Sequence, residues 1–257
     1  MIRKWQGAPS NLHATTIDEV IASLDKIVDW SKTNNKRAGY FAALYRKVTK
    51  NVKQGIETGL FDDGPRMEKL DVIFANRYLD AFEAYASGER VSDVWQLAFE
   101  TTERWFPLVL VHLMIGMNAH INFDLGIAAA ETVEVDQLSD LKPDFEKIND
   151  VLSSLVDEVE NELAQIWPMF GVLDRFAGSL DERLADAGMA FARDRAWAFA
   201  EEVSSSNNKV KTLTDMDKKI TTIGQLFLSP GLIKNVLLLL IRVAERGNVR
   251  KKIKILE

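Results

Sequence analysis

The sequence predicts an all-α protein, and two observations carry this prediction. Glycine and proline are scarce, at 14 and 6 among 257 residues, so few positions break regular structure. Between these breaks, apolar residues recur at spacings of three and four, which is the period of an amphipathic helix. The hydrophobic share of 47% and the charged share of 27% are those of an ordinary globular protein. We expect a single multi-helix bundle spanning residues 1–257, with a nearly fully buried central helix.

Four helices are expected in the first part of the chain. Thr16 suits the N-cap of the first helix because its hydroxyl can accept a hydrogen bond from an early backbone N–H. The turn "GLFDDGPRM" separates the second helix from the third, and "SGERVSD" separates the third from the fourth. The expected ranges are about 16–31, 39–58, 65–87 and 92–102.

The second part of the chain begins with a segment over about 106–130 that is apolar on nearly every side, as expected of a helix surrounded by others. The loop "EVDQLSDLKPD" then precedes an amphipathic helix over about 143–167. Two further helices share about 173–204, and "SSSNNK" indicates a mobile loop over 204–210. A last helix covers about 230–246 and leads into a basic C-terminal segment, 246–257.

Bulk composition excludes several classes of protein. The net charge of −6 argues against a general nucleic-acid binder, which would normally be basic. The absence of cysteine excludes disulfides, a thiol nucleophile and cysteine-ligated metals, and it fits a reducing compartment. The first residues lack the apolar core of a signal peptide, and no stretch approaches about 18 apolar residues. We therefore expect a cytoplasmic protein without a transmembrane segment.

Charge is distributed unevenly along the chain. Residues 131–162 hold eleven acidic residues and two lysines, whereas residues 242–257 hold six basic and two acidic residues. Solvated helix faces and a basic C-terminus that suits the helix dipole explain this pattern. Alternatively, the C-terminal basic helix contacts an anionic membrane surface or a partner helix.

The segment "HLMIGMNAHINFDLG" places unusual polarity in the apolar helix. It contains two of the three histidines, His112 and His120, together with Asp124. On a helical wheel His112 and His120 share one face, with Gly116 between them, and Asp124 lies on the side of His120. Each buried polar group costs about 1–3 kcal/mol if it has no partner. We therefore expect these side chains to satisfy one another or something bound between them.

Two asparagines in the same segment lie on a different face of the helix. Asn118 and Asn122 are four residues apart, as neighbours on a helix surface are. An extended segment is the alternative, because "NAHINFDL" also alternates polar and apolar residues. That conformation would bring both asparagines to the same side as His120 and Asp124.

The third helix supplies candidate partners for these groups. Arg77 falls on its apolar face, which also carries Tyr78, and Asp71 sits beside Tyr78 on the wheel. A guanidinium on an apolar face needs a carboxylate, a carbonyl or an anionic ligand. Asp124 or Asp71 could pair with Arg77.

Three interpretations of the polar cluster remain open. The first is a structural network with the pairs His120–Asp124 and Arg77–Asp71. The second is a metal-assisted hydrolase in which His120 and Asp124, joined by His112 or Asp71, bind a divalent ion such as zinc and activate water. The third is a non-catalytic pocket for a small acidic or lipid-like ligand. In that pocket Arg77 meets the acidic group and the aromatic rings of Trp105, Phe106 and Phe123 meet the rest of the ligand. Further ligand contacts are expected from Asp71, Asn118, Asn122 and Tyr78.

The residues "MNAHINFDLGIAAA" resemble a family of uncharacterised bacterial proteins, a domain of unknown function typified by an Asn-Ala-His-Ile-Asn-x-Asp-Leu segment. The resemblance extends upstream through "GLFDDGPRMEKLDVIFANRYLDAFEAY" and downstream through "LKPDFEKINDVL", so it covers about residues 40–160. It implies a bacterial, all-helical protein. The family provides no activity to carry over, but the resemblance draws attention to the His and Asn side chains of the segment.

Overall fold

The structure, a computed structural model, describes the backbone of residues 5–167, 180–228 and 242–257. Every regular element within these ranges is a helix, so the prediction of an all-α fold is confirmed. The elements are α1 (Ile17–Asn34), α2 (Ala38–Glu57), α3 (Gly64–Ser87), α4 (Asp93–Thr102), α5 (Val109–Ala119), the π-helical turn η1 (His120–Asp124), α6 (Leu125–Thr132), the 3₁₀ turn η2 (Val135–Gln137), α7 (Leu138–Ser153), α8 (Val156–Ile166), α10 (Leu180–Ser205), α11 (Lys209–Leu228) and α13 (Val249–Leu256).

The four N-terminal helices begin and end close to where the sequence predicts. The hydroxyl of Thr16 accepts a hydrogen bond from the backbone N–H of Glu19 at 3.2 Å, so the predicted N-cap of α1 is confirmed. The Asp63 carboxylate caps α3 in the same way, accepting from the backbone N–H of Arg66 at 3.0 Å. Gly88 ends α3 with a φ of 86°, a left-handed conformation that suits glycine.

The single helix predicted over 143–167 is wrong, because two helices occupy this part of the chain. α7 begins at Leu138, within the expected loop, and α8 follows after a break at residues 154–155. The Ser154 hydroxyl donates to the carbonyl of Val151 at 2.7 Å, and the backbone N–H of Leu155 bonds to the Leu152 carbonyl instead. A serine that competes for helical acceptors in this way favours a helix end.

The C-terminal part contains two helices that the sequence did not assign, α11 and α13. The loop expected at 204–210 is shorter in the structure, because only residues 206–208 connect α10 to α11. The hydroxyl of Ser206 in this connection is 2.8 Å from the hydroxyl of Thr212 on α11, a hydrogen bond. The Asn208 side chain accepts from the backbone N–H of Lys211 at 3.1 Å and caps the start of α11. Residues 173–179 and 230–241, parts of the helices expected at 173–204 and 230–246, lie outside the described residues.

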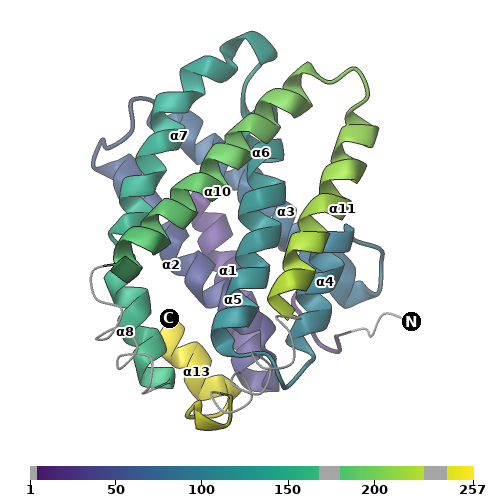
Figure 1. The fold of residues 1–257 in the computed structure, drawn as a ribbon, viewed down its shortest axis with the longest axis vertical. Helices are drawn as coiled ribbons and strands as arrows, with labels where there is room; N and C mark the ends of the chain where they lie inside the picture. The colour runs from purple at the N-terminus through teal and green to yellow at the C-terminus, as the bar shows by residue number, and fades with distance from the viewer. Residues whose placement is uncertain (1–4, 168–179, 229–241) are drawn as a thin grey trace.

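The helices pack side by side with α5, η1 and α6 forming one continuous column (Figure 1). α2 and α3 pack against this column, α10 crosses the bundle diagonally and contacts α6, and α11 contacts α5 and α4. A Cβ added at Gly126 of α6 would lie 2.6 Å from the carbonyl oxygen of Ala196, so glycine permits the backbones of α6 and α10 to approach closely. None of the helices in the described ranges is both long and apolar enough to cross a bilayer.

Candidate functional site

The polar segment forms part of a continuous helical column rather than a strand. α5 passes into the π-helical turn at His120, and α6 continues the column to Thr132. The extended alternative for residues 118–124 is therefore wrong. No residue from Pro107 to Ala130 is exposed. π-Helical turns are rare, and they occur frequently at functional sites.

Asp124 is the centre of a paired polar group, which we call the Asp124 group. One carboxylate oxygen accepts from Nε of Arg77 at 2.9 Å, and the other accepts from Nε1 of Trp95 at 2.7 Å. Only 1% of Asp124 is exposed, whereas 27% of the Arg77 side chain is. The Arg77–Asp71 pair of the structural interpretation is wrong, because the partner of Arg77 is Asp124. Both oxygens of Asp124 are thus engaged by protein donors.

His120 lies beside the Asp124 group but is not hydrogen-bonded to it. Its Nδ1 is 3.9 Å from the nearer oxygen of Asp124, beyond hydrogen-bond distance. The imidazole stacks on the ring of Phe74 with centroids 3.6 Å apart, and it meets the ring of Tyr45 edge-on at 4.3 Å. Burial lowers the pKa of His120 and outweighs the nearby carboxylate, so the ring is neutral at physiological pH.

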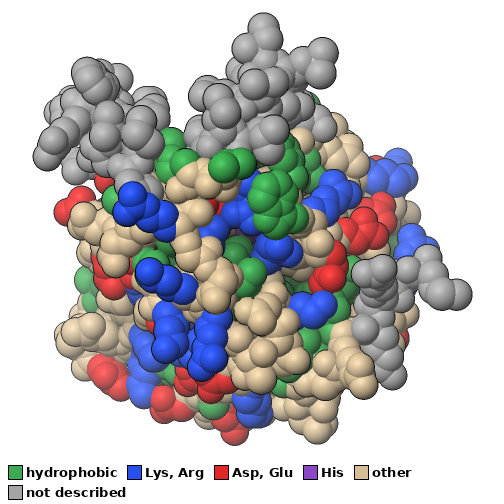
Figure 2. All heavy atoms as spheres, turned by 90° about the horizontal axis from the view of Figure 1, so that it is seen from below, with side chains coloured by type: hydrophobic (Ala, Val, Ile, Leu, Met, Phe, Trp, Pro, Cys, Tyr) green, Lys and Arg blue, Asp and Glu red, His purple; other side chains and the backbone are tan. Residues whose placement is uncertain are grey.

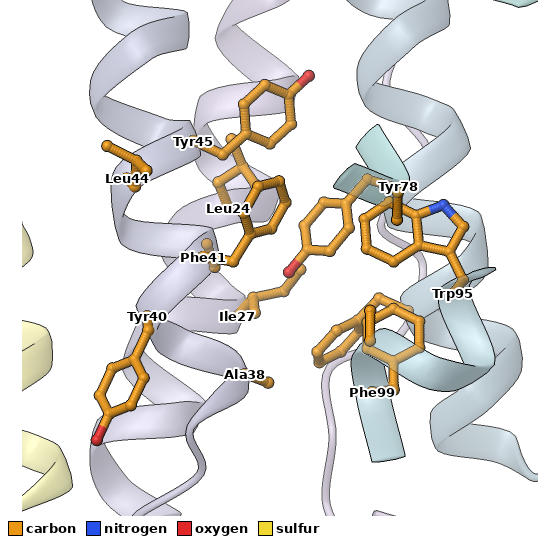
Figure 3. Close-up of a cluster of buried hydrophobic side chains, with 14 of the residues drawn as sticks. Leu24, Ile27, Ala38, Tyr40, Phe41, Leu44, Tyr45, Tyr78, Trp95 and Phe99 are labelled. Carbon is orange, nitrogen blue, oxygen red and sulfur yellow. The ribbon is translucent and has the colours of Figure 1, made fainter. Parts of the chain in front are cut away.

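Aromatic rings from three helices surround this histidine. Figure 3 shows Phe41 and Tyr45 reaching from α2 toward Tyr78 of α3 and Trp95 of α4. The predicted ligand contact Tyr78 is 1% exposed, and its hydroxyl has no hydrogen-bond partner in the described part of the chain. Burial raises its pKa far above the ordinary value, so the phenol stays protonated.

His112 has separate surroundings from His120, although both project toward α2. Its ring contacts Tyr40 at 5.7 Å between centroids. A Cβ added at Gly116 would lie 2.7 Å from the ring of Phe41, so Phe41 occupies the space between the two histidines. Burial, assisted by the positive charges of Arg37 and other cations, lowers the pKa of His112 to about 3.

The two asparagines join the column to α11. Nδ2 of Asn118 donates to the carbonyl of Ile220 at 3.0 Å, and Nδ2 of Asn122 donates to Oδ1 of Asn118 at 3.1 Å. This chain of hydrogen bonds lies on another face of the column from His120, as the helical wheel predicts. Neither asparagine lines the large cavity described below.

Asp71, on α3, is another buried carboxyl group. It is 7% exposed, and its Oδ2 has no hydrogen-bond partner within the described residues. Burial, with a smaller contribution from the charge of Glu68, raises the pKa of Asp71 to about 7. The group is therefore partly protonated near neutral pH. In contrast to Asp124, it borders an open space.

That space is a partly open cavity of about 720 Å³ between the helices. The α5–η1 column contributes Leu110, Met114, Met117 and Ile121, which are spaced as one helix face and are all partly accessible. On α2 the lining runs from Phe41 to Val52, which corresponds to roughly 16 Å along a helix axis. Other apolar lining residues come from α2, α3 and α8, and include Leu44, Val48, Met67, Leu70, Val159 and Leu163.

Few polar side chains line the cavity, and four of those described are buried with an unpaired atom: Tyr45, Asp71, His120 and Arg193. Asp71 and His120 lie at its wall, and Arg193 of α10 reaches it from another side. Arg193 is 4% exposed, donates to the carbonyl of Phe145 and lies 4.3 Å above the Phe145 ring. Burial lowers its pKa to about 9, and no carboxylate among the described residues pairs with it.

Arg193 was missed by the sequence analysis, although the sequence carries a signal for it. Arg193, Ala196, Trp197 and Ala200 are spaced as one helix face, and the last three are buried hydrophobic residues. An arginine on the same helix face as these apolar residues needs an anionic or polar partner, which is the argument already made for Arg77.

Within the described residues, no three His, Asp or Glu side chains come close enough to hold a metal ion together. His120 and Asp124 are the predicted ligands, and the oxygens of Asp124 already accept hydrogen bonds from Arg77 and Trp95. Metal binding by this pair stays a prediction.

Comparison with known proteins identifies the family but supplies no activity. No curated protein and no solved structure matches the chain. A family model described as a family of unknown function, DUF5995, matches residues 17–230, more than the 40–160 over which the resemblance was expected. The chain therefore belongs to the family of unknown function DUF5995.

Proposed function

We propose that this protein binds an elongated, mainly apolar small molecule in the cavity between α2, α3, α5, α7 and α8. The observation that carries the proposal is the cavity itself, because about 720 Å³ of apolar-lined space lies within the range of small-molecule sites. Well-packed cores leave few voids larger than a water molecule. A partly open cavity of this size between the helices favours a bound ligand over incomplete packing.

The polar groups at the wall support a ligand with one acidic group. Arg193 is a buried guanidinium whose described contacts are a carbonyl and an aromatic ring rather than a carboxylate. A carboxylate or phosphate on the ligand would supply the missing charge through charge-assisted hydrogen bonds. Arg77, which the sequence singled out for this role, is neutralised by Asp124.

Asp71 would act on the ligand through its protonation state. With a pKa of about 7, its carboxyl group is neutral in slightly acidic solution and can then donate a hydrogen bond. Above pH 7 the group is charged and opposes an anionic ligand. An acidic ligand should therefore bind more tightly at pH 6 than at pH 8.

The metal-assisted hydrolase is tested separately, by elemental analysis of the purified protein. Stoichiometric zinc, manganese or iron that is lost in His120→Ala would support the hydrolase. Metal-free protein that binds apolar probes would support the binding protein.

Two fluorescent probes that differ in one group test the proposal, a long-chain fatty acid and its methyl ester. We expect saturable binding of both, with the acid bound more tightly. In Met117→Trp the larger side chain fills the cavity, and we expect affinity for both probes to fall at least tenfold. Met216→Trp is the matched control, since Met216 lies on α11 and does not line the cavity. Equal binding by Met117→Trp and the unmodified protein would overturn the proposal.

The role of the guanidinium is tested by Arg193→Met, which keeps an unbranched chain and removes the charge. We expect the affinity for the acid to fall about tenfold, while the affinity for the ester is unchanged. Arg195→Met is the matched control, because Arg195 is an exposed arginine two residues away. Equal losses for acid and ester would show that Arg193 does not recognise the acidic group.

A further inference from the structure

Large hydrophobic side chains are exposed together at one end of the bundle. Trp105 is 56% exposed, its neighbour Phe106 37% and Val243 71%. Arg242 joins the two chain segments, because its Nε donates to the carbonyl of Trp105 at 2.7 Å and its guanidinium lies 4.9 Å from the Trp105 ring. We call Trp105, Phe106 and Val243 the exposed apolar cluster.

The two glutamates of the segment that carries Val243 are paired with cations. Glu245 accepts a hydrogen bond from Lys252 at 2.6 Å and also pairs with Arg242. Glu257 pairs with Lys32 at 2.7 Å. Both glutamates of the segment 242–257 are thus engaged by internal cations.

Exposed cations lie in the chain segments that carry this cluster. Figure 2 shows Lys and Arg side chains across the middle of this end with hydrophobic side chains between them, and Asp and Glu side chains toward its edges. For five exposed cations of residues 104–106 and 242–257 the described part of the chain offers no carboxylate within 4 Å. They are Arg104, Arg246, Arg250, Lys251 and Lys254. The segment 242–257 is therefore basic, with six cations and two glutamates, although the whole chain carries a net charge of −6.

We propose that this end docks on an anionic lipid bilayer, with the exposed apolar cluster entering the interfacial region and the five cations contacting lipid headgroups. Tryptophan favours the boundary between headgroups and acyl chains, and its exposure here provides such an anchor. Long cationic side chains reach anionic headgroups without a fixed geometry, which suits a fluid surface. The proposed contact is peripheral, in agreement with the absence of a spanning helix in the described ranges.

The docking end adjoins the cavity. Leu110, near the start of α5, and Trp167, after the end of α8, both line the cavity. The backbone N–H of Arg246 donates to the carbonyl of Ile166 at 2.7 Å, so the basic segment is hydrogen-bonded to the C-terminal end of α8. If the cavity binds an apolar molecule, as proposed above, a docked protein would exchange that molecule with the bilayer at this end.

Flotation of the full chain with lipid vesicles tests the docking. We expect the protein to float with vesicles of phosphatidylcholine and phosphatidylglycerol, to float at least tenfold less with phosphatidylcholine alone, and to be released by high salt. Arg246→Glu/Lys251→Glu should reduce the bound fraction at least tenfold. Lys209→Glu/Lys211→Glu makes the same charge change at the start of α11, and it should float normally.

The apolar contribution is tested by Trp105→Ser/Val243→Ser, with circular dichroism to verify folding. We expect weaker flotation that remains sensitive to the charge of the vesicle. Met117→Trp should lose probe binding and still float, so failure of the cavity proposal and failure of the docking proposal are distinguishable. Equal flotation with neutral and anionic vesicles would overturn the docking proposal. Normal flotation of Arg246→Glu/Lys251→Glu would overturn it as well.

Discussion

Two buried carboxyl groups, Asp124 and Asp71, lie in the same core and have opposite surroundings. Asp124 is held by Arg77 and Trp95, with each oxygen accepting one hydrogen bond. Asp71 has an oxygen without a partner among the described residues, and it borders the cavity. In the folded protein each oxygen of Asp124 accepts a hydrogen bond, whereas Oδ2 of Asp71 remains available to a ligand. The comparison separates polar residues that stabilise the bundle from polar residues that remain free to bind.

Removal of the paired carboxylate should have the largest effect on stability. Asp124→Ala leaves Arg77 and the indole N–H of Trp95 without their acceptor inside the core. We expect the free energy of unfolding to fall by about 3 kcal/mol, the lower end for breaking a buried pair because Arg77 is partly exposed. Urea denaturation measures this, with the exposed Asp136→Ala as control. A loss no larger than that of the control would show that Asp124 does not stabilise the fold.

Removal of the unpaired carboxyl should have a pH-dependent effect of the opposite sign. The pKa of Asp71 rises from 3.8 to about 7 on folding, so the folded state retains a proton that the unfolded state releases between these pH values. Stability therefore falls as the pH rises through this window. Asp71→Asn removes the dependence, and its stability relative to the unmodified protein should be about 2–3 kcal/mol more favourable at pH 8 than at pH 5. Parallel pH profiles of the two proteins would contradict the assigned role.

The indole donor of the Asp124 group should contribute less than the carboxylate. Trp95→Phe keeps an aromatic ring in the core and removes the N–H that donates to Asp124 at 2.7 Å. We expect a loss of about 2 kcal/mol, since hydrogen bonds to charged groups contribute more than neutral ones. The control is Trp197→Phe, whose indole donates to the carboxylate of the exposed Glu201 at 2.9 Å. If thermal unfolding shows the same loss of stability for Trp95→Phe and Trp197→Phe, the burial of Asp124 does not strengthen its hydrogen bond with Trp95.

Arg193→Met should have the smallest effect on stability. The change gives up one hydrogen bond to the carbonyl of Phe145, but it also removes a guanidinium that is buried without a carboxylate partner. We expect the free energy lost with the hydrogen bond and the free energy gained by removing the buried charge to offset one another to within about 1 kcal/mol in the absence of ligand. A loss as large as that of Asp124→Ala would mean that Arg193 is a structural residue.

Local rules were sufficient to predict much of the fold. The N-cap at Thr16 and the helix breaks around residues 60 and 90 depend only on residues close in sequence, and the structure has helix boundaries at all three places. The break near Ser154 was missed because the apolar spacing continues through it and only a side-chain hydrogen bond marks it.

The candidate site was less predictable, because it depends on how helices distant in sequence meet. The sequence placed Arg77, Asp71 and Asp124 on interior faces, but it did not indicate which of the two carboxylates forms an ion pair with Arg77. The π-helical turn has no signature in the apolar pattern. A cavity is a property of several helices together, and no single helix of the sequence indicates it. Arg193 was missed for this reason, although its own helix face carried a signal.

The π-helical turn at 120–124 has a consequence for chain length in this family. Its hydrogen bonds run to the fifth residue rather than the fourth, so it takes up one more residue than an α-helical turn. A chain with one residue fewer here would form an ordinary α-helical turn, and Gly126 would still face the carbonyl of Ala196. Deletion of one residue within 120–124 should therefore be more acceptable than a deletion elsewhere in α5 or α6, which would rotate every later residue of the column by about 100°.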